Sequence, residues 1–502
     1  MNRFVRLLVS TGLVASPAGA DTLREALAKA YEGNPTITAQ RAAQRATDEN
    51  VPIARSNGLP SVNLTGGYTE NVLIPGNSFL SPARVAQGVG QVSVPLYQGG
   101  AVKNSVAAAE TRVLAGRANL RGTESDLFTS TVGAYMDVIR DEAIVSLNRQ
   151  NVRVLDINLQ ASRDRFQVGD LTRTDVAQSE ARLALARSQL QTAEGRLISS
   201  RENYIQIVGT PPVNLEQPPV LPNLPGSPVV AVDTAIRNNP FLIAAQQQRD
   251  ATRYDVNIAR SNRLPRVSAV VGGNYTNYLG SLTTGTTDSI NQSATGGTVG
   301  LQLTLPIFQG GRPAAQVRQA EALRAQSIEN TTATERSVIA QTRSAYAAWR
   351  SALEVIASSE IAVNANKLSL EGVRAENSVG TRTILDILNA EQELLNSQVT
   401  LVTARRDAYV AGFALLASMG NAEARDLGLG GGALYDPLTN YRRVRNTIND
   451  FADDGEPAPV AVTTAATPAQ TAIVTKPLDP MLDTPVDRSR GLTTGAASPD
   501  RR

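Results

Sequence analysis

The sequence predicts an all-α framework joined to a membrane β-barrel, built from a duplicated unit of long antiparallel coiled-coil helices plus two strand pairs. Three observations support this fold class. The chain repeats its own motifs about 200 residues apart, it contains long proline-free tracts with a heptad pattern, and it contains short segments of alternating polar and apolar residues. These features follow one another in the same order in both halves.

The duplication is visible in residues that recur at a nearly fixed offset. The segment Val168–Val176 (VGDLTRTDV) returns 211 positions later as Val379–Ile387 (VGTRTILDI), and VPLYQGG returns as LPIFQGG at the same offset. Earlier in each half an Asn-Pro pair recurs at an offset of 205 positions. A period of this length is too long for a solenoid repeat and indicates a duplicated domain. We therefore assign residues 21–220 to the first repeat and residues 221–428 to the second.

Both ends of the chain differ from the repeats. Residues 1–20 are expected to be a secretory signal peptide, because Arg3 and Arg6 precede a short apolar run and the Ala-Gly-Ala before Asp21 is a typical cleavage site. Residues 429–502 become rich in Pro, Ala and Thr and show no clear helical or strand period. This composition predicts a disordered C-terminal tail.

The composition excludes several functional classes. The 502-residue chain has no Cys and no His, and its formal net charge is +2. Without Cys there are no disulfides or cysteine nucleophiles, and without His the commonest general base and metal ligand is missing. No enzyme activity, metal or cofactor is therefore expected. The nearly balanced charge argues against nucleic acid as a partner. After the signal peptide no apolar run reaches the 18 residues that a transmembrane helix needs.

Long helices are expected where Ala, Leu, Gln, Glu, Arg and Ser dominate and proline is absent. Four tracts meet this description: Ala101–Gln167, Thr172–Val208, Ala314–Ser378 and Thr383–Met419. As one continuous helix the first tract is roughly 100 Å long at about 1.5 Å per residue, although a break near residues 140–146 stays open.

A heptad pattern indicates how these helices pack. In the first repeat a column of large residues, Val176, Leu183, Leu190, Leu197 and Tyr204, recurs every seven positions. The column three residues later is made mostly of Ser and Ala, and the second repeat shows the same two columns. Large side chains that face small ones allow close antiparallel coiled-coil packing.

Strands are expected between the helical tracts, where polar and apolar residues alternate. The segments lie at about residues 59–70, 88–97, 264–278 and 296–308. Each is about ten residues long, which is the length of a tilted membrane-spanning strand, and aromatic residues lie near the strand ends. Four strands are too few to close a membrane barrel, because the smallest closed ones have about eight. At least two chains must therefore share one barrel, and the pattern alone does not choose between two and three.

The order of elements and the repeated motifs together resemble the TolC-like outer-membrane efflux proteins. VGDLTRTDV at Val168–Val176 is similar to the first tip motif of that family, and VGTRTILDIL at Val379–Leu388 is similar to the second. The PLYQGG and PIFQGG segments after the strands also fit the family. The resemblance extends from about Asp21 to Gly428, so only the tail lies outside it.

The resemblance implies a homotrimer with a 12-stranded barrel in the outer membrane, continued by a 12-helix periplasmic tunnel. The inner end of the tunnel would be closed until a periplasmic adaptor protein and an inner-membrane transporter of the RND or ABC type dock to it. The implied function is export of small molecules, type I secreted proteins or both, and the implied location is the outer membrane, in contact with its lipid.

The resemblance also assigns roles to the two tip motifs. The turns between the long helices would dock the adaptor; their residues are Val168, Gly169, Leu171, Thr172, Val379, Gly380, Thr381 and Thr383. The same glycines and threonines are suited to helix termination and capping, so a purely structural role stays open.

Four further residues would form the periplasmic gate. By resemblance Arg382 bonds to the Thr174-Asp175 pair of a neighbouring helix, and Asp386 lines the constriction as a ring of three carboxylates that favours cations and raises its own pKa. The structural alternatives are a solvated arginine and a first-turn aspartate favoured by the helix dipole. Asn377 and Asn389 depart from the family pattern, in which a tyrosine and a second aspartate stand there. We expect a gate with fewer links and about three fewer charges per trimer.

Two other functions compete with this interpretation. A soluble periplasmic coiled-coil adaptor would also have long helical hairpins, but it would lack duplicated strand pairs flanked by aromatic residues. An enzyme is disfavoured by the absence of His and Cys and of a phosphate-binding loop.

Overall fold

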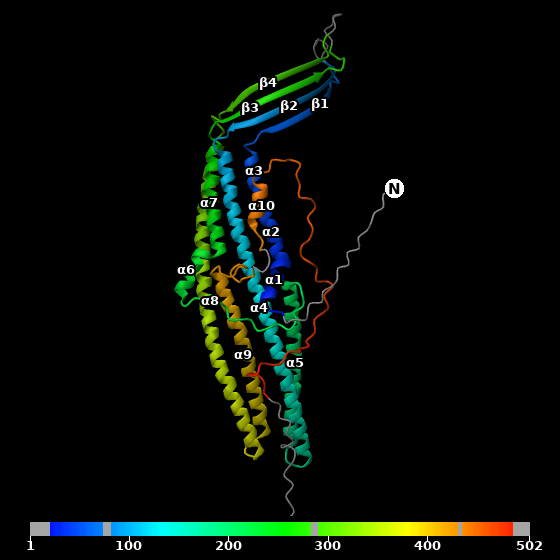
Figure 1. Ribbon diagram of the computed structural model, residues 1–502, viewed down its shortest axis with the longest axis vertical. Coiled ribbons are helices and arrows are strands. Elements are labelled where there is room, and N and C mark those ends of the chain that lie inside the picture. Colours follow the sequence, from blue (N-terminus) through cyan, green and yellow to red (C-terminus); the bar gives the residue numbers. More distant parts are fainter. Residues whose placement is uncertain (1–20, 74–81, 283–289, 430–433, 485–502) are drawn as a thin grey trace, which may run out of the picture.

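The two repeats form an elongated molecule with a β-sheet at one end and two helical hairpin turns at the other (Figure 1). The computed structural model describes residues 21–73, 82–282, 290–429 and 434–484. The expected signal peptide, residues 1–20, lies outside the described residues. None of the described helices is long and apolar enough to cross a membrane.

Nearly the same series of elements occurs twice. The first repeat contains α1 (Leu23–Gly33), α2 (Pro35–Asp48), α3 (Asn50–Ser56), β1 (Ser61–Glu70), β2 (Arg84–Tyr97), α4 (Ala101–Gln167) and α5 (Arg173–Val208). The second contains α6 (Pro228–Asn238), α7 (Pro240–Ser261), β3 (Arg266–Asn277), β4 (Ser293–Thr304), α8 (Arg312–Ser378) and α9 (Ile384–Ser418). The exception is that two helices of the first repeat, α2 and α3, correspond to the single helix α7 of the second. Asn34 and Asn239 cap α2 and α7 through their side chains, and each is followed by a proline at the first helical position.

The long helices form where the composition predicts them. Both α4 and α8 contain 67 residues and run without interruption, so the break considered near residues 140–146 is absent. At about 1.5 Å per residue each is roughly 100 Å long. Each folds back onto the next helix, so that α4 with α5 and α8 with α9 form two antiparallel hairpins (Figure 1).

The predicted heptad columns lie in the contacts between these helices. Leu183, Leu197 and Tyr204 of the large column are buried, and Ser179 and Ala186 of the small column are buried with them. The largest apolar cluster joins α4, α5 and α9 around four aromatic residues, Phe128, Tyr135, Tyr204 and Phe413. The large-to-small pattern therefore marks the packed face of the helices, as expected for coiled-coil packing.

The four strands form one antiparallel sheet in the order β1-β2-β3-β4. They match the predicted segments, with shifts at the ends: β2 begins at Arg84 and β4 ends at Thr304, so Phe308 lies beyond the strand. A register shift between Pro95 and Tyr97 bends the end of β2, where proline cannot continue the ladder. Within the described residues β1 pairs only with β2 and β4 only with β3, so the sheet has two open edges.

The expectation of a disordered tail over residues 429–502 is wrong for part of its length. Residues Pro437–Val444 form the helix α10, which Asp436 caps and whose Val444 is buried. Further on, Leu482 is buried in a cluster with residues of α4, α8 and α9. The composition misled because an extended segment needs no internal period when its backbone is bonded to neighbouring helices.

Candidate functional site

The sheet is amphipathic, and its register makes one face apolar across all four strands. Val62, Val92, Val271 and Val299 are successive cross-strand partners, and partners directly opposite each other project to the same face. Ala269 and Leu301 are paired in the neighbouring row of that face. On β4 the side chains of Val299 and Leu301 are 84% and 74% exposed.

The opposite face of the sheet is more polar, although Val89 and Val270 also project to it. Asn63 pairs with Gln91, and the row continues through Gly272 to Thr298. An exposed apolar surface that extends over a whole sheet indicates contact with lipid or with another protein. The polar face matches the water-filled interior that outer-membrane barrels have.

The two hairpin turns at the other end of the molecule have the same local structure. Gly169 has φ +87° and Gly380 has φ +80°, a left-handed conformation that glycine adopts without strain. In both turns the chain is closed by matching backbone bonds, in which Asp170 N donates to Arg165 O at 2.9 Å and Thr381 N donates to Glu376 O at 3.0 Å. The left-handed backbone conformation at each turn therefore explains why glycine occupies this position in both tip motifs.

Apolar side chains project into solvent at both turns. Val168 and Val379 are each 75% exposed, and they occupy the same position in the two motifs. Leu171 is half-buried in the first turn, whereas Thr381 is exposed in the second. Two equivalent exposed valines at the end of the molecule are suited to contact with another protein.

A capping box begins the helix after each turn. Thr172 Oγ1 accepts a hydrogen bond from Asp175 N at 3.3 Å, and Asp175 Oδ2 accepts one from Thr172 N at 2.9 Å. Thr383 and Asp386 form the same pair of bonds at 3.3 and 3.0 Å. Hydrogen bonds from the threonine hydroxyl and then its backbone amide lower the pKa of both carboxyl groups. Because these pKa values are lowered on folding, the caps stabilise the helices at neutral pH and are lost as the pH falls through the lowered values.

The structure does not form the predicted Arg382 lock within one chain. Arg382 Nε donates to Glu376 Oε2 at 2.7 Å, so its described partner belongs to the same hairpin rather than to the Thr174-Asp175 pair. Thr174 is exposed at the start of α5, and Asp175 is engaged in its capping box. Glu376, which lies six residues before Arg382 on the other side of the turn, was missed in the sequence analysis.

The two asparagines that depart from the family pattern both make contacts. Asn377 Nδ2 donates to Arg382 O at 2.7 Å, which fixes the second turn. Asn389 Oδ1 accepts from Arg182 Nη2 at 2.8 Å and so joins α9 to α5. The preceding residue, Leu388, is 1% exposed and packs among apolar residues of α4 and α5. The sequence did not indicate this connection between the hairpins near their tips.

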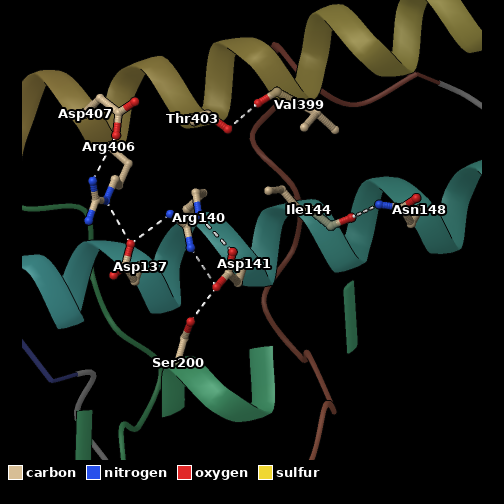
Figure 2. Close-up of polar contacts among 10 residues, drawn as sticks. All are labelled: Asp137, Arg140, Asp141, Ile144, Asn148, Ser200, Val399, Thr403, Arg406 and Asp407. Atoms are coloured by element: carbon tan, nitrogen blue, oxygen red, sulfur yellow. Dashed lines mark hydrogen bonds and ion pairs between the residues drawn. The ribbon is translucent and has the colours of Figure 1, made fainter. Parts of the chain in front are cut away.

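A second connection lies farther up the hairpins, and we call its residues Asp137, Arg140, Asp141, Ser200 and Arg406 the brace (Figure 2). Arg140 donates to both carboxylate oxygens of Asp141, from Nε at 2.8 Å and from Nη2 at 2.9 Å. Ser200 Oγ on α5 donates to the same carboxylate at 2.5 Å. Arg406 Nε on α9 donates to Asp137 Oδ1 at 2.8 Å.

The brace therefore connects three helices through charged groups that are largely removed from water. The side chain of Asp141 is only 4% exposed, and those of Arg140, Asp137 and Arg406 are about one quarter exposed. Burial of these charges is tolerated because each has an opposite partner. The residues of the brace were not identified from the sequence, because charged residues within a helical tract are normally expected to be exposed to solvent. No group of described acidic residues could hold a metal ion.

Comparison with known proteins places the chain in a family. The model of the family described as "Outer membrane efflux protein" matches residues 26–210 and 231–421, one segment in each repeat. The chain is 33% identical over 441 residues to the outer membrane efflux protein BepC of Brucella suis, covering 88% of this chain and 94% of that protein. It is 26% identical over 490 residues to the outer membrane protein TolC of Escherichia coli, covering 93% and 97%.

The fold agrees with this assignment. The outer membrane channel CmeC of Campylobacter jejuni superimposes with a TM-score of 0.71 at 14% identity, covering 85% of this chain and 90% of that one. Because the matches to efflux proteins extend over nearly the whole length of the chain, they do not favour the alternative function of a soluble periplasmic adaptor. The chain belongs to the outer membrane efflux protein family, and it is a channel-tunnel that is located in the outer membrane, extends into the periplasm and serves export.

Proposed function

We propose that three copies of this chain form one export conduit, with a closed 12-stranded barrel at the sheet end and a 12-helix tunnel behind it. The observation that carries the proposal is the amphipathic four-stranded sheet with two open edges. An unpaired strand edge in lipid costs several kcal/mol per group, so β4 of one chain must pair with β1 of the next. Three such sheets supply the twelve strands, with the valine rows toward lipid and the polar rows toward the lumen.

The tips of the hairpins would then form the periplasmic end of the tunnel. The exposed Val168 and Val379 are the contacts that we assign to a periplasmic adaptor, together with the other tip residues of the two motifs. The adaptor would connect the conduit to an inner-membrane transporter of the RND or ABC type. The cargo would be small molecules, type I secreted proteins or both. Channel formation is tested by adding purified protein to planar lipid bilayers, where discrete conductance steps are expected and a complete lack of steps would contradict the proposal.

Arg382 is proposed to restrict the closed conduit by binding Asp175 of a neighbouring chain. The in-chain partner Glu376 holds the guanidinium at the tip, where it can exchange one carboxylate for another. Arg382→Ser and Asp175→Ala should both raise the single-channel conductance, whereas Glu376→Gln should not. Thr172→Ala is the control for Asp175→Ala, because it weakens the cap and leaves the carboxylate. Unchanged conductance in both Arg382→Ser and Asp175→Ala would remove the lock.

Asp386 is proposed to contribute a ring of three negative charges at the constriction. Its capping bonds with Thr383 lower its pKa in the single chain, the opposite direction to the one expected from like-charge repulsion in a ring. In the single chain the carboxylate is therefore charged at neutral pH. Asp386→Asn should reduce the preference of the channel for cations over anions, measured as the reversal potential in a salt gradient. If Asp386→Asn channels prefer cations as strongly as the unmodified channel does, residues other than Asp386 determine the ion selectivity.

A further inference from the structure

The C-terminal segment Gln470–Thr484 crosses from the first hairpin to the second, and we call this segment the strap. In Figure 1 the red end of the chain passes α5 and reaches α9. On the first hairpin Arg201 Nη1 and Nη2 donate to the carbonyl oxygens of Thr471 at 2.5 Å and Ile473 at 3.0 Å. Arg149 Nη2 on α4 donates to the carbonyl oxygen of Ala472 at 2.8 Å. The first part of the strap is therefore held by two arginines through its backbone.

The second part of the strap is anchored on α8 and α9. Gln398 Nε2, which is itself 4% exposed, donates to Leu482 O at 2.7 Å. Lys367 Nζ on α8 donates to Asp483 O at 3.2 Å, and Arg405 Nη1 on α9 pairs with Asp479 Oδ2 at 2.9 Å. Side chains from all four long helices thus bind one short segment.

Leu482 is the apolar anchor of the strap. It is 2% exposed and lies in a cluster with residues of three helices: Leu147 of α4, Val363 and Leu370 of α8, and Ile387, Leu394, Leu395, Leu401 and Val402 of α9. The cluster therefore contains residues of both hairpins, with a side chain of the strap among them. Backbone bonds to donors plus one buried side chain are the features of a groove that binds an extended peptide.

We propose that this groove is a binding site for the strap, and that the strap ties the two hairpins together and opposes their separation. The second half of this statement rests on the proposed function, in which the hairpin tips form the closed periplasmic end of the conduit, and it adds that the two hairpins move apart when that end opens. The strap lies across both hairpins, so it must leave at least one of them before they can move apart. Its contacts along the backbone also explain why its sequence shows no periodic pattern.

Binding in the groove is tested with a fluorescent peptide of residues 470–484 and two truncated chains. The chain that ends at Ala469 has an empty groove and should bind the peptide, measured by fluorescence anisotropy. The chain that ends at Thr484 is the matched control, because its groove is filled by its own strap and it should bind little peptide. The peptide with Leu482→Glu should bind at least about tenfold more weakly, since it loses the buried anchor. Equal binding of the peptide to both chains, or binding to neither, would overturn the proposal.

The effect on opening is tested by bilayer conductance of the same two chains and of full-length Leu482→Glu. Loss of the strap should raise the conductance or the fraction of time spent open, both in the chain that ends at Ala469 and in Leu482→Glu. Channels that behave identically with and without the strap would overturn its tying role and leave the proposed function intact. If no chain forms channels, including the unmodified full-length chain, the proposed function is contradicted instead. The peptide measurement would then still show whether the groove binds the strap.

Discussion

Lysine at both Val299 and Leu301 of β4 should remove the protein from the outer membrane. Both side chains lie on the apolar face of the sheet and are exposed in the single chain. A lysine near the bilayer midplane on the lipid face of a barrel costs about 2–4 kcal/mol, so the pair should cost about 4–8 kcal/mol. We expect the double variant to be found outside the outer-membrane fraction or degraded, as measured by membrane fractionation and immunoblotting.

The matched control uses the other face of the same strand. Thr298 and Gln302 flank the two apolar positions and project to the polar face. Thr298→Lys with Gln302→Lys adds the same two charges to the same strand, but in the proposed lumen, so the protein should stay in the outer membrane. Equal loss from the membrane in both double variants would show that the two faces of the sheet do not differ as we claim.

Removal of the central arginine of the brace should strongly destabilise the helical part of the molecule. Arg140→Ala leaves the carboxylate of Asp141 buried, with only the hydroxyl of Ser200 as a partner. Loss of one partner from a buried ion pair typically costs about 3–5 kcal/mol, and we expect the lower end because that hydroxyl remains. The midpoint of thermal helix unfolding, followed by circular dichroism in detergent, should fall by several degrees.

A surface ion pair between α4 and α5 of the first hairpin provides the comparison. Arg187 on α5 lies 3.3 Å from Asp156 on α4, and both side chains are more than 60% exposed. Exposed pairs contribute about 0–1 kcal/mol, so Arg187→Ala should leave the unfolding midpoint nearly unchanged. If the two arginine variants unfold at the same temperature, burial of the brace does not have the effect that we assign to it.

The sequence predicts the helices and strands well, because both depend on local patterns. Proline-free tracts with heptads gave α4 and α8 as long helices, and alternation gave all four strands with small shifts at their ends. The duplication also supported the prediction, since the motif that begins at Val168 occurs again at Val379 and indicates the same helix-turn-helix structure in both repeats. The capping roles of Thr172 and Thr383 are also local and could be predicted from their spacing to the following aspartates.

Contacts between distant segments could not be predicted in this way. Nothing local connects Arg182 to Asn389, or Asp137 to Arg406, because each pair is separated by more than 200 positions. Leu482 is one of several apolar residues in a Pro-rich tail, and only the packed helices show that, of those the structure describes, it is the one that is buried. Arg382 was assigned a partner by resemblance, whereas the single chain places it on Glu376.

The mass of the purified protein in detergent tests the central claim most directly. The account requires β1 and β4 to find partners on other copies of the chain, because their outer edges are open in the single chain. Native mass spectrometry should give a complex of three identical chains, and adding lysine at Val299 and Leu301 should abolish it. A protein that is monomeric in detergent and still embedded in outer-membrane vesicles would contradict the account.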